Sequence, residues 1–180
     1  MNGAALATAQ IPSALWSRPD ARVHAVIDGS VLAGLPTRLQ AAQTMGWDCL
    51  QRGALTADAA ARAAYIVELQ PESEFTAWLV GEACVAYDGW GVLMTSARPL
   101  LAMREHSRDL AEVRAPDGRR RPWRWWDHEL LTMLMPGLAP SQLDAFFAAG
   151  QQLVVPQARR WTWWQKLDGV LDRQVRERVA

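Results

Sequence analysis

Asp117-Gly-Arg-Arg-Arg-Pro-Trp-Arg-Trp-Trp-Asp127 is the stretch that decides how the chain is organised. Its first two residues, Asp117-Gly118, favour a tight two-residue turn because glycine tolerates a positive φ at little cost. Residues 112–115 before the turn and the Arg-Trp run after it therefore predict a β-hairpin. From Asp127 onward the sequence changes character, so we place the boundary between two lobes at this residue.

The Arg-Trp run itself has the composition of a binding segment. On an extended strand, Trp123 and Trp125 would share one face, and Arg124 and Trp126 the other. We expect Trp125 to lie in the core, and Trp126 and Arg124 to reach a cleft or a partner. Large aromatic surfaces beside fixed positive charge suit recognition, and the run holds no nucleophile with its base. The alternative is that all three tryptophans fill a core while Arg124 pairs with Asp127.

Before the hairpin, predicted strands and helices alternate, which is typical of a sheet with helices packed on it. The third strand is continuously apolar and should be buried on both faces. After a loose lead-in over residues 1–20, we predict an α/β (mixed α+β) lobe over residues 21–127, with a mixed sheet flanked by helices. The predicted strands cover residues 22–27, 64–69 and 89–96, and the predicted helices cover 32–49, 73–86 and 99–110.

After the hairpin, residues 128–180 predict a smaller, mainly helical C-terminal lobe. Two short helices are expected over residues 128–135 and 141–149, because prolines and a glycine separate them. A short hairpin follows at residues 153–155 and 160–164. Residues 165–180 are charged and amphipathic, and we predict a terminal helix there.

Composition narrows the class of protein. A chain of 180 residues, half of them hydrophobic, is long enough for one domain with a sizeable core. The formal net charge is zero, with 19 basic and 19 acidic residues, which argues against a general binder of nucleic acids or anionic membranes. No signal peptide or membrane span is indicated. We expect a cytoplasmic protein in which Cys49 and Cys84 are free thiols.

Candidate catalytic chemistry is sparse. His24, His106 and His128 lack metal-ligand spacing, so we predict neither a metal site nor a cofactor. Asp28 could be an active-site acid, although Asp28-Gly29 is more simply a turn after a strand. A hydrolase that uses Asp28, His106 or Asp127 in a cleft between the lobes stays as an alternative. Interleaved arginine and tryptophan could also bind single-stranded nucleic acid, but the basic cluster is short.

Four landmarks, in order and spacing, resemble a known family. They are His24-Ala-Val-Ile-Asp-Gly29, Trp90-Gly-Val-Leu-Met-Thr-Ser96, a helix with Leu100 or Leu101 before His106 and Arg108, and the Asp117-Gly118 hairpin that returns to Arg124-Trp-Trp-Asp127. Together they resemble the small adaptor or chaperone proteins of bacterial type VI secretion, whose genes lie beside those of spike (VgrG) proteins and toxic effectors. One departure is His128-Glu129, where the family has Pro-Arg, so an anion replaces a cation.

The resemblance implies a two-lobed α/β protein that binds a cognate effector and helps to load it onto the spike without turnover of a substrate. The expected partner is therefore a protein, the secreted effector or the spike, and the chain is expected not to be an enzyme. The residues expected to bind the partner are Arg124, Trp126, Asp127, Trp161 and Trp163. Those expected to serve the structural motif are Asp28, Gly29, His106, Asp117, Gly118 and Trp125.

Overall fold

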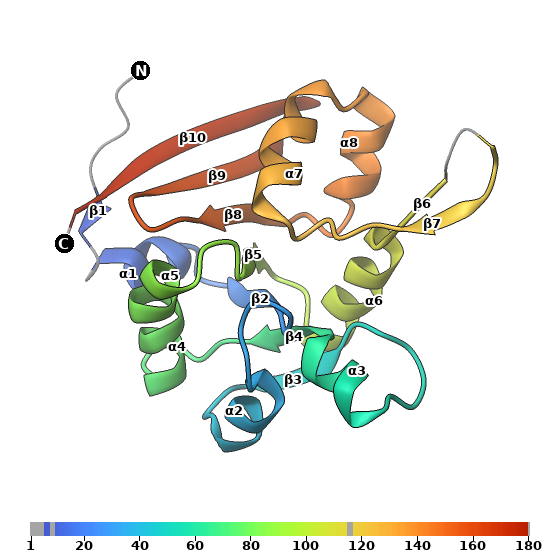
Figure 1. Cartoon of the computed structure of the whole chain (residues 1–180). Coiled ribbons are helices and arrows are strands. Elements are labelled where there is room, and N and C mark those ends of the chain that lie inside the picture. The colour runs from blue at the N-terminus through green and yellow to red at the C-terminus, as the bar shows by residue number, and fades with distance from the viewer. Residues whose placement is uncertain (1–5, 8–9, 115–116, 180) are drawn as a thin grey trace.

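The computed structural model describes residues 6–7, 10–114 and 117–179, and most of its strands form one sheet (Figure 1). The order of strands in this sheet is β1-β10-β9-β8-β5-β2-β4-β3. Neighbours from β10 to β3 run antiparallel, and β1 lies parallel to β10. The strands are β1 (Leu6–Ala7), β2 (Arg22–Asp28), β3 (Gly46–Cys49), β4 (Ala64–Glu68), β5 (Gly91–Ser96), β8 (Gln152–Pro156), β9 (Arg160–Leu167) and β10 (Val170–Val179).

Both faces of the sheet are covered, which confirms the predicted mixed α/β class. Strands β2, β4 and β5 are buried at every position except Arg22, and the burial of all six residues of β5 is as predicted. Successive side chains point to opposite faces of a strand, so these continuous runs supply two cores. On β2, Ala25 and Ile27 belong to the first core and Val26 to the second.

The first core lies beneath the helices of the N-terminal half. It includes Ile11 and Leu15, so part of the segment predicted as a loose lead-in is a short, buried helix. Ser73 caps the predicted helix after β4 by accepting a hydrogen bond from the Thr76 N–H. The helices on this face are α1 (Ile11–Leu15), α2 (Leu35–Ala41), α4 (Glu74–Trp78), a π-helical turn (Leu79–Ala83) and α5 (Cys84–Ala86).

The second core lies beneath helices that follow β5. Met103, Leu131 and Phe146 contribute one buried side chain from each of these helices. The elements are α6 (Leu100–Leu110), α7 (His128–Leu134), a 3-10 turn (Met135–Gly137) and α8 (Pro140–Phe146). Helix α3 (Ala57–Arg62), for which we had no sequence-based prediction, buries none of its side chains.

The predicted hairpin is confirmed as a separate two-stranded sheet that projects from the rest of the molecule (Figure 1). It comprises β6 (Glu112–Arg114) and β7 (Arg120–Pro122), and Gly118 has a φ of +78° in the connection. Residues 115–116, the last part of its predicted first strand, lie outside the described residues. The second strand ends at Pro122, so residues 123–126 lie outside the strand, and residues 125–126 form a turn to which the predicted alternation does not apply.

One predicted helix is wrong, and a second is shorter than predicted. The terminal helix over residues 165–180 is instead the end of β9 and the whole of β10, which pair as a hairpin around Asp168 (φ +49°) and Gly169 (φ +81°). Positive φ at both turn residues matches the twist of a two-residue hairpin. The helix predicted over residues 32–49 ends at Ala41, because the chain then enters β3 as an edge strand beside β4.

The strands of the predicted C-terminal lobe extend the same sheet, since β8 pairs with β5. Both cysteines are free; Cys84 is buried in α5, whereas Cys49 is half-buried in β3 and not in a helix. Within the described part of the chain, no helix combines the length and apolar character needed to cross a membrane.

Candidate functional site

The carboxylate of Asp28, at the end of β2, is the centre of a buried polar network. Its side chain is almost fully buried, and it accepts four hydrogen bonds. Oδ1 accepts from the Ser30 backbone N–H (2.8 Å) and the Ser30 hydroxyl, and Oδ2 accepts from the Trp126 indole N–H (2.8 Å) and the Arg124 guanidinium. Asp28 and Trp126 are 98 positions apart in the sequence. The network therefore ties the Arg-Trp segment to the end of the central strand.

The electrostatics of this network favour the ionised carboxylate. Burial by itself would raise the pKa of Asp28, but the hydrogen bonds from Ser30 and Trp126 and the charge of Arg124 outweigh burial. The pKa of Asp28 is therefore held below its ordinary value. An acid that is ionised and saturated with donors has no proton to give and no oxygen lone pair directed at a substrate, so the arrangement is suited to holding structure.

Two positions beside this network must be glycine, because neighbouring backbone atoms lie too close for a Cβ atom. A Cβ on Gly29 would lie 2.6 Å from the carbonyl oxygen of Ala63 and 2.7 Å from that of Ala61. A Cβ on Gly91 would lie 1.9 Å from the Val26 carbonyl oxygen, and its φ is +147°. The Asp-Gly and Trp-Gly landmarks thus mark the places where β2 meets its neighbours without room for a side chain.

The segment from Arg124 to Asp127 is divided between core and surface. Trp125 is fully buried, as predicted, and its indole N–H donates to the Ser107 carbonyl at 2.9 Å. Trp126 is also buried, because it turns inward to reach Asp28. Arg124 keeps about half of its side chain exposed (53%), and Asp127 caps α7 by accepting hydrogen bonds from two backbone N–H groups.

The other expected site residues occupy structural positions as well. Trp161 and Trp163 of β9 are buried in the first core, so a partner could reach them only after rearrangement. The His106 Nε2 atom lies 2.9 Å from the Phe146 carbonyl oxygen and 2.9 Å from the Gln151 amide nitrogen, and these contacts join α6 to the end of α8. Burial, more than any other influence, lowers the pKa of His106.

Asp117 and Gly118 form the turn of the projecting hairpin. Asp117 accepts a hydrogen bond from the Arg119 N–H at 3.0 Å and forms an ion pair with Arg121 at 2.9 Å. Both contacts lie within the hairpin itself, so the pair stabilises the turn.

The side chains considered for a hydrolase belong to three separate networks. Asp28 is bound to Ser30 and Arg124, His106 faces the end of α8, and Asp127 caps α7. In the described ranges, no group of three or more histidine, cysteine, aspartate or glutamate side chains could hold a metal ion.

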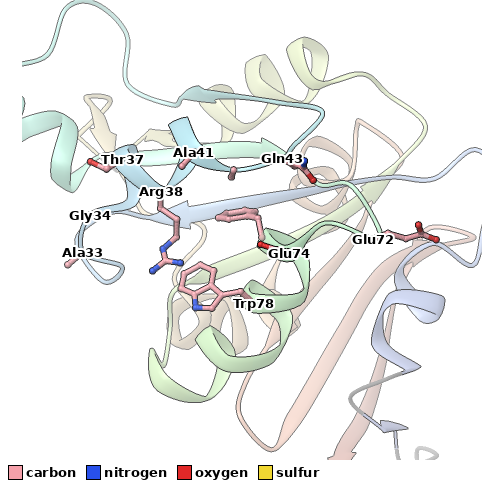
Figure 2. Close-up of a pocket in the computed structure, with 11 residues that line it drawn as sticks. Ala33, Gly34, Thr37, Arg38, Ala41, Gln43, Glu72, Glu74 and Trp78 are labelled. Carbon is pink, nitrogen blue, oxygen red and sulfur yellow. The ribbon is translucent and has the colours of Figure 1, made fainter.

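A hollow of the surface lies between α2 and α4 and has a volume of about 1150 Å³ (Figure 2). From α2, Arg38 points across it, and its guanidinium carbon lies 3.9 Å from the centroid of the Trp78 ring. Glu72 and Glu74 lie on the α4 side, and Phe75 adds apolar surface. We call this hollow the α2–α4 groove; it combines an aromatic wall with charges of both signs.

No local sequence signal predicts this groove. Trp78 is predicted correctly in a helix with Phe75, but nothing in the surrounding pattern marks Arg38 as its partner. Among described residues, neither Glu72 nor Glu74 has an ion-pair partner. Trp78 is half-buried and Arg38 is exposed, and tryptophan and arginine are enriched in protein–protein contacts.

Comparison with known proteins gives one family. The family described as "Domain of unknown function (DUF4123)" matches residues 23–145, well over half of the chain. The matched stretch contains the four landmarks, the α2–α4 groove and the β6–β7 hairpin, and it ends before β8. Comparisons with curated proteins and with solved structures gave no significant match.

Proposed function

This chain belongs to the DUF4123 family, and we propose that it is a non-catalytic adaptor of bacterial type VI secretion. In this role it binds a cognate toxic effector in the cytoplasm and helps to load the effector onto the VgrG spike. The motifs that resemble such adaptors lie within the matched residues 23–145.

One observation carries the proposal: both carboxylate oxygens of Asp28, a residue of the first landmark, accept hydrogen bonds from groups of the same chain. Its two oxygens take four donors from Ser30, Trp126 and Arg124. A catalytic carboxylate needs an oxygen free to meet a substrate or a water molecule. Asp28 therefore serves to stabilise the fold, which favours a protein that binds a partner at its surface.

The α2–α4 groove is the surface that best fits an effector segment. Its volume of about 1150 Å³ exceeds that of ordinary small-molecule pockets and suits several side chains of a peptide. The Arg38–Trp78 stack offers a flat aromatic and cationic surface, while Glu72 and Glu74 add charge on the opposite side. Arg124, whose side chain is half exposed beside Asp28, is a second residue that could contact the partner, as its sequence context predicts.

The test is capture of partners from the native bacterium under conditions in which the secretion system is expressed. Tagged wild-type chain should retain an effector or a spike protein, identified by mass spectrometry. Arg38→Glu should lose most of that capture, because it reverses the charge that stacks on Trp78. Arg62→Glu is the matched control, since Arg62 is likewise an exposed arginine in the last turn of a short helix. Recovery of neither an effector nor a spike protein would sink the proposal.

A further inference from the structure

The β6–β7 hairpin carries an unfavourable arrangement of charge. Its register places Arg114 directly opposite Arg120. Like charges opposite each other across two antiparallel strands destabilise the pairing. Arg120 is partly compensated by an ion pair with Glu112 at 3.0 Å, whereas Arg114 has no ion-pair partner among the residues that the structure describes. The end of the hairpin near its turn therefore carries an excess of positive charge.

A hollow of about 560 Å³ lies at the base of this hairpin. Four arginines and two carboxylates contribute to its walls, so the formal charge of the lining is +2 (four minus two). Arg108 is nearly buried and is fixed by the carbonyl oxygens of Cys49 and Leu50, at 2.8 and 3.1 Å, and by Glu105 at 2.8 Å. The lining residues are Arg52, Arg108, Asp109, Glu112, Arg114 and Arg120, with Val113.

The positions of these arginines in the fold concentrate their charge. Arg52 comes from the connection after β3, Arg108 from the last turn of α6, and Arg114 and Arg120 from the two strands of the hairpin. Figure 1 shows strands β6 and β7 standing away from the large sheet, and every residue of the two strands is exposed. Arg120 exposes three quarters of its side chain (75%).

We propose that strands β6 and β7 and the hollow at their base form a docking surface for an acidic segment of a partner protein. Carboxylates of such a segment would pair with Arg114 and Arg120 and relieve the repulsion across the hairpin. Arginine binds carboxylates through two parallel N–H···O bonds, which suits separate acidic side chains. The register and the hollow carry this inference, which is independent of the secretion role proposed above.

Nucleic acid fits the same surface less well. Base stacking needs an open aromatic face, and no aromatic side chain lines this hollow among the described residues. Trp123, at the base of the hairpin, is half-buried with its indole nitrogen out of contact with solvent.

The test measures binding of a fluorescein-labelled poly-glutamate peptide to the full chain by fluorescence anisotropy. We expect wild type to bind the peptide more tightly than an oligothymidylate of equal charge, and to lose affinity as salt rises. Arg114→Glu with Arg120→Glu should weaken peptide binding by roughly tenfold or more. The matched control is Arg18→Glu with Arg159→Glu, two exposed arginines on other connections, which makes the same change in net charge.

A second variant separates binding from folding. Arg114→Glu alone places a carboxylate opposite Arg120, so the melting temperature should stay the same or rise while peptide affinity falls. Three results would overturn the inference: no peptide binding by wild type, equal loss in the control pair, or tighter binding of the oligothymidylate. Because the peptide is the probe, a failed capture of an effector leaves this test unaffected.

Discussion

Replacement of Asp28 by asparagine should destabilise the fold strongly, although the two side chains have nearly the same shape. An asparagine offers one oxygen and one NH2 group in place of two oxygens. If its oxygen faces Ser30, its NH2 group faces the Trp126 N–H, and two donors then meet. If the amide is reversed, the conflict moves to Ser30.

The magnitude follows from the burial of each partner. Trp126 is 9% exposed, so its N–H would be left buried without an acceptor, at a cost of about 1–3 kcal/mol. The ion pair with Arg124 is half exposed and adds no more than about 1 kcal/mol. We therefore expect Asp28→Asn to lower the free energy of unfolding by about 1–4 kcal/mol at pH 7. For a chain of this length that loss corresponds to roughly 2–16 °C in melting temperature.

The same carboxylate predicts a dependence on pH. The pKa of Asp28 is lower in the folded state than its ordinary value of about 4. The stability that it contributes is therefore complete above that ordinary value and is lost as the pH falls through the folded pKa. Asparagine does not titrate, so the gap between wild type and Asp28→Asn should be constant above about pH 5 and narrow below about pH 4.

Urea unfolding at several pH values measures both effects. Asp127→Asn is the matched control, because asparagine caps a helix about as well as aspartate and this change should cost less than about 0.5 kcal/mol. A loss below about 1 kcal/mol in Asp28→Asn, or a loss equal to that of the control, would refute the role assigned to the Asp28 network.

Three further changes test the packing. Trp125→Ala should cost about 3–5 kcal/mol in urea unfolding, because the side chain is fully buried; a loss below about 1 kcal/mol would show that the core tolerates its removal. Gly29→Ala should cost about 1–3 kcal/mol, because the new Cβ would meet backbone atoms, whereas Gly118→Ala has open space around it and should cost only about 1 kcal/mol. The reverse order in thermal melts would contradict the close approach of Gly29 to Ala61 and Ala63. Burial raises the pKa of both thiols, so a thiol reagent should modify half-buried Cys49 slowly and buried Cys84 more slowly still, and both rapidly after unfolding without reduction. A disulfide between them would contradict this.

Short sequence motifs correctly predict the turns and helix ends that depend only on neighbouring residues. Asp117-Gly118 predicts its hairpin correctly, and Ser73 predicts the start of α4. The same Asp-Gly pair occurs at Asp168-Gly169, yet the charged and amphipathic pattern around it predicts a helix, which is wrong. Strand β10 lies near the edge of the sheet and carries polar side chains on both faces, so the alternation that marks a half-buried strand is absent.

The contacts that build the candidate site could not be predicted, because they join distant parts of the chain. The alternation of an extended strand places Trp126 outward, but Pro122 ends the strand and Trp126 turns inward to Asp28. Arg108 binds backbone carbonyl oxygens of residues 49 and 50, acceptors that every residue type carries. The stack of Arg38 on Trp78 depends on how α2 and α4 lie beside each other.

We propose that this protein binds its partner stoichiometrically and does not transform it. The most direct measurement is to co-express the chain with each protein encoded beside it, purify any complex by size exclusion, and determine the composition and the intact mass of both components. We predict a stable complex of fixed ratio in which the partner's mass is unchanged, and loss of that complex in Arg38→Glu but not in Arg62→Glu. A partner that is released with an altered mass, or the absence of a complex with every neighbouring effector and spike protein, would contradict it.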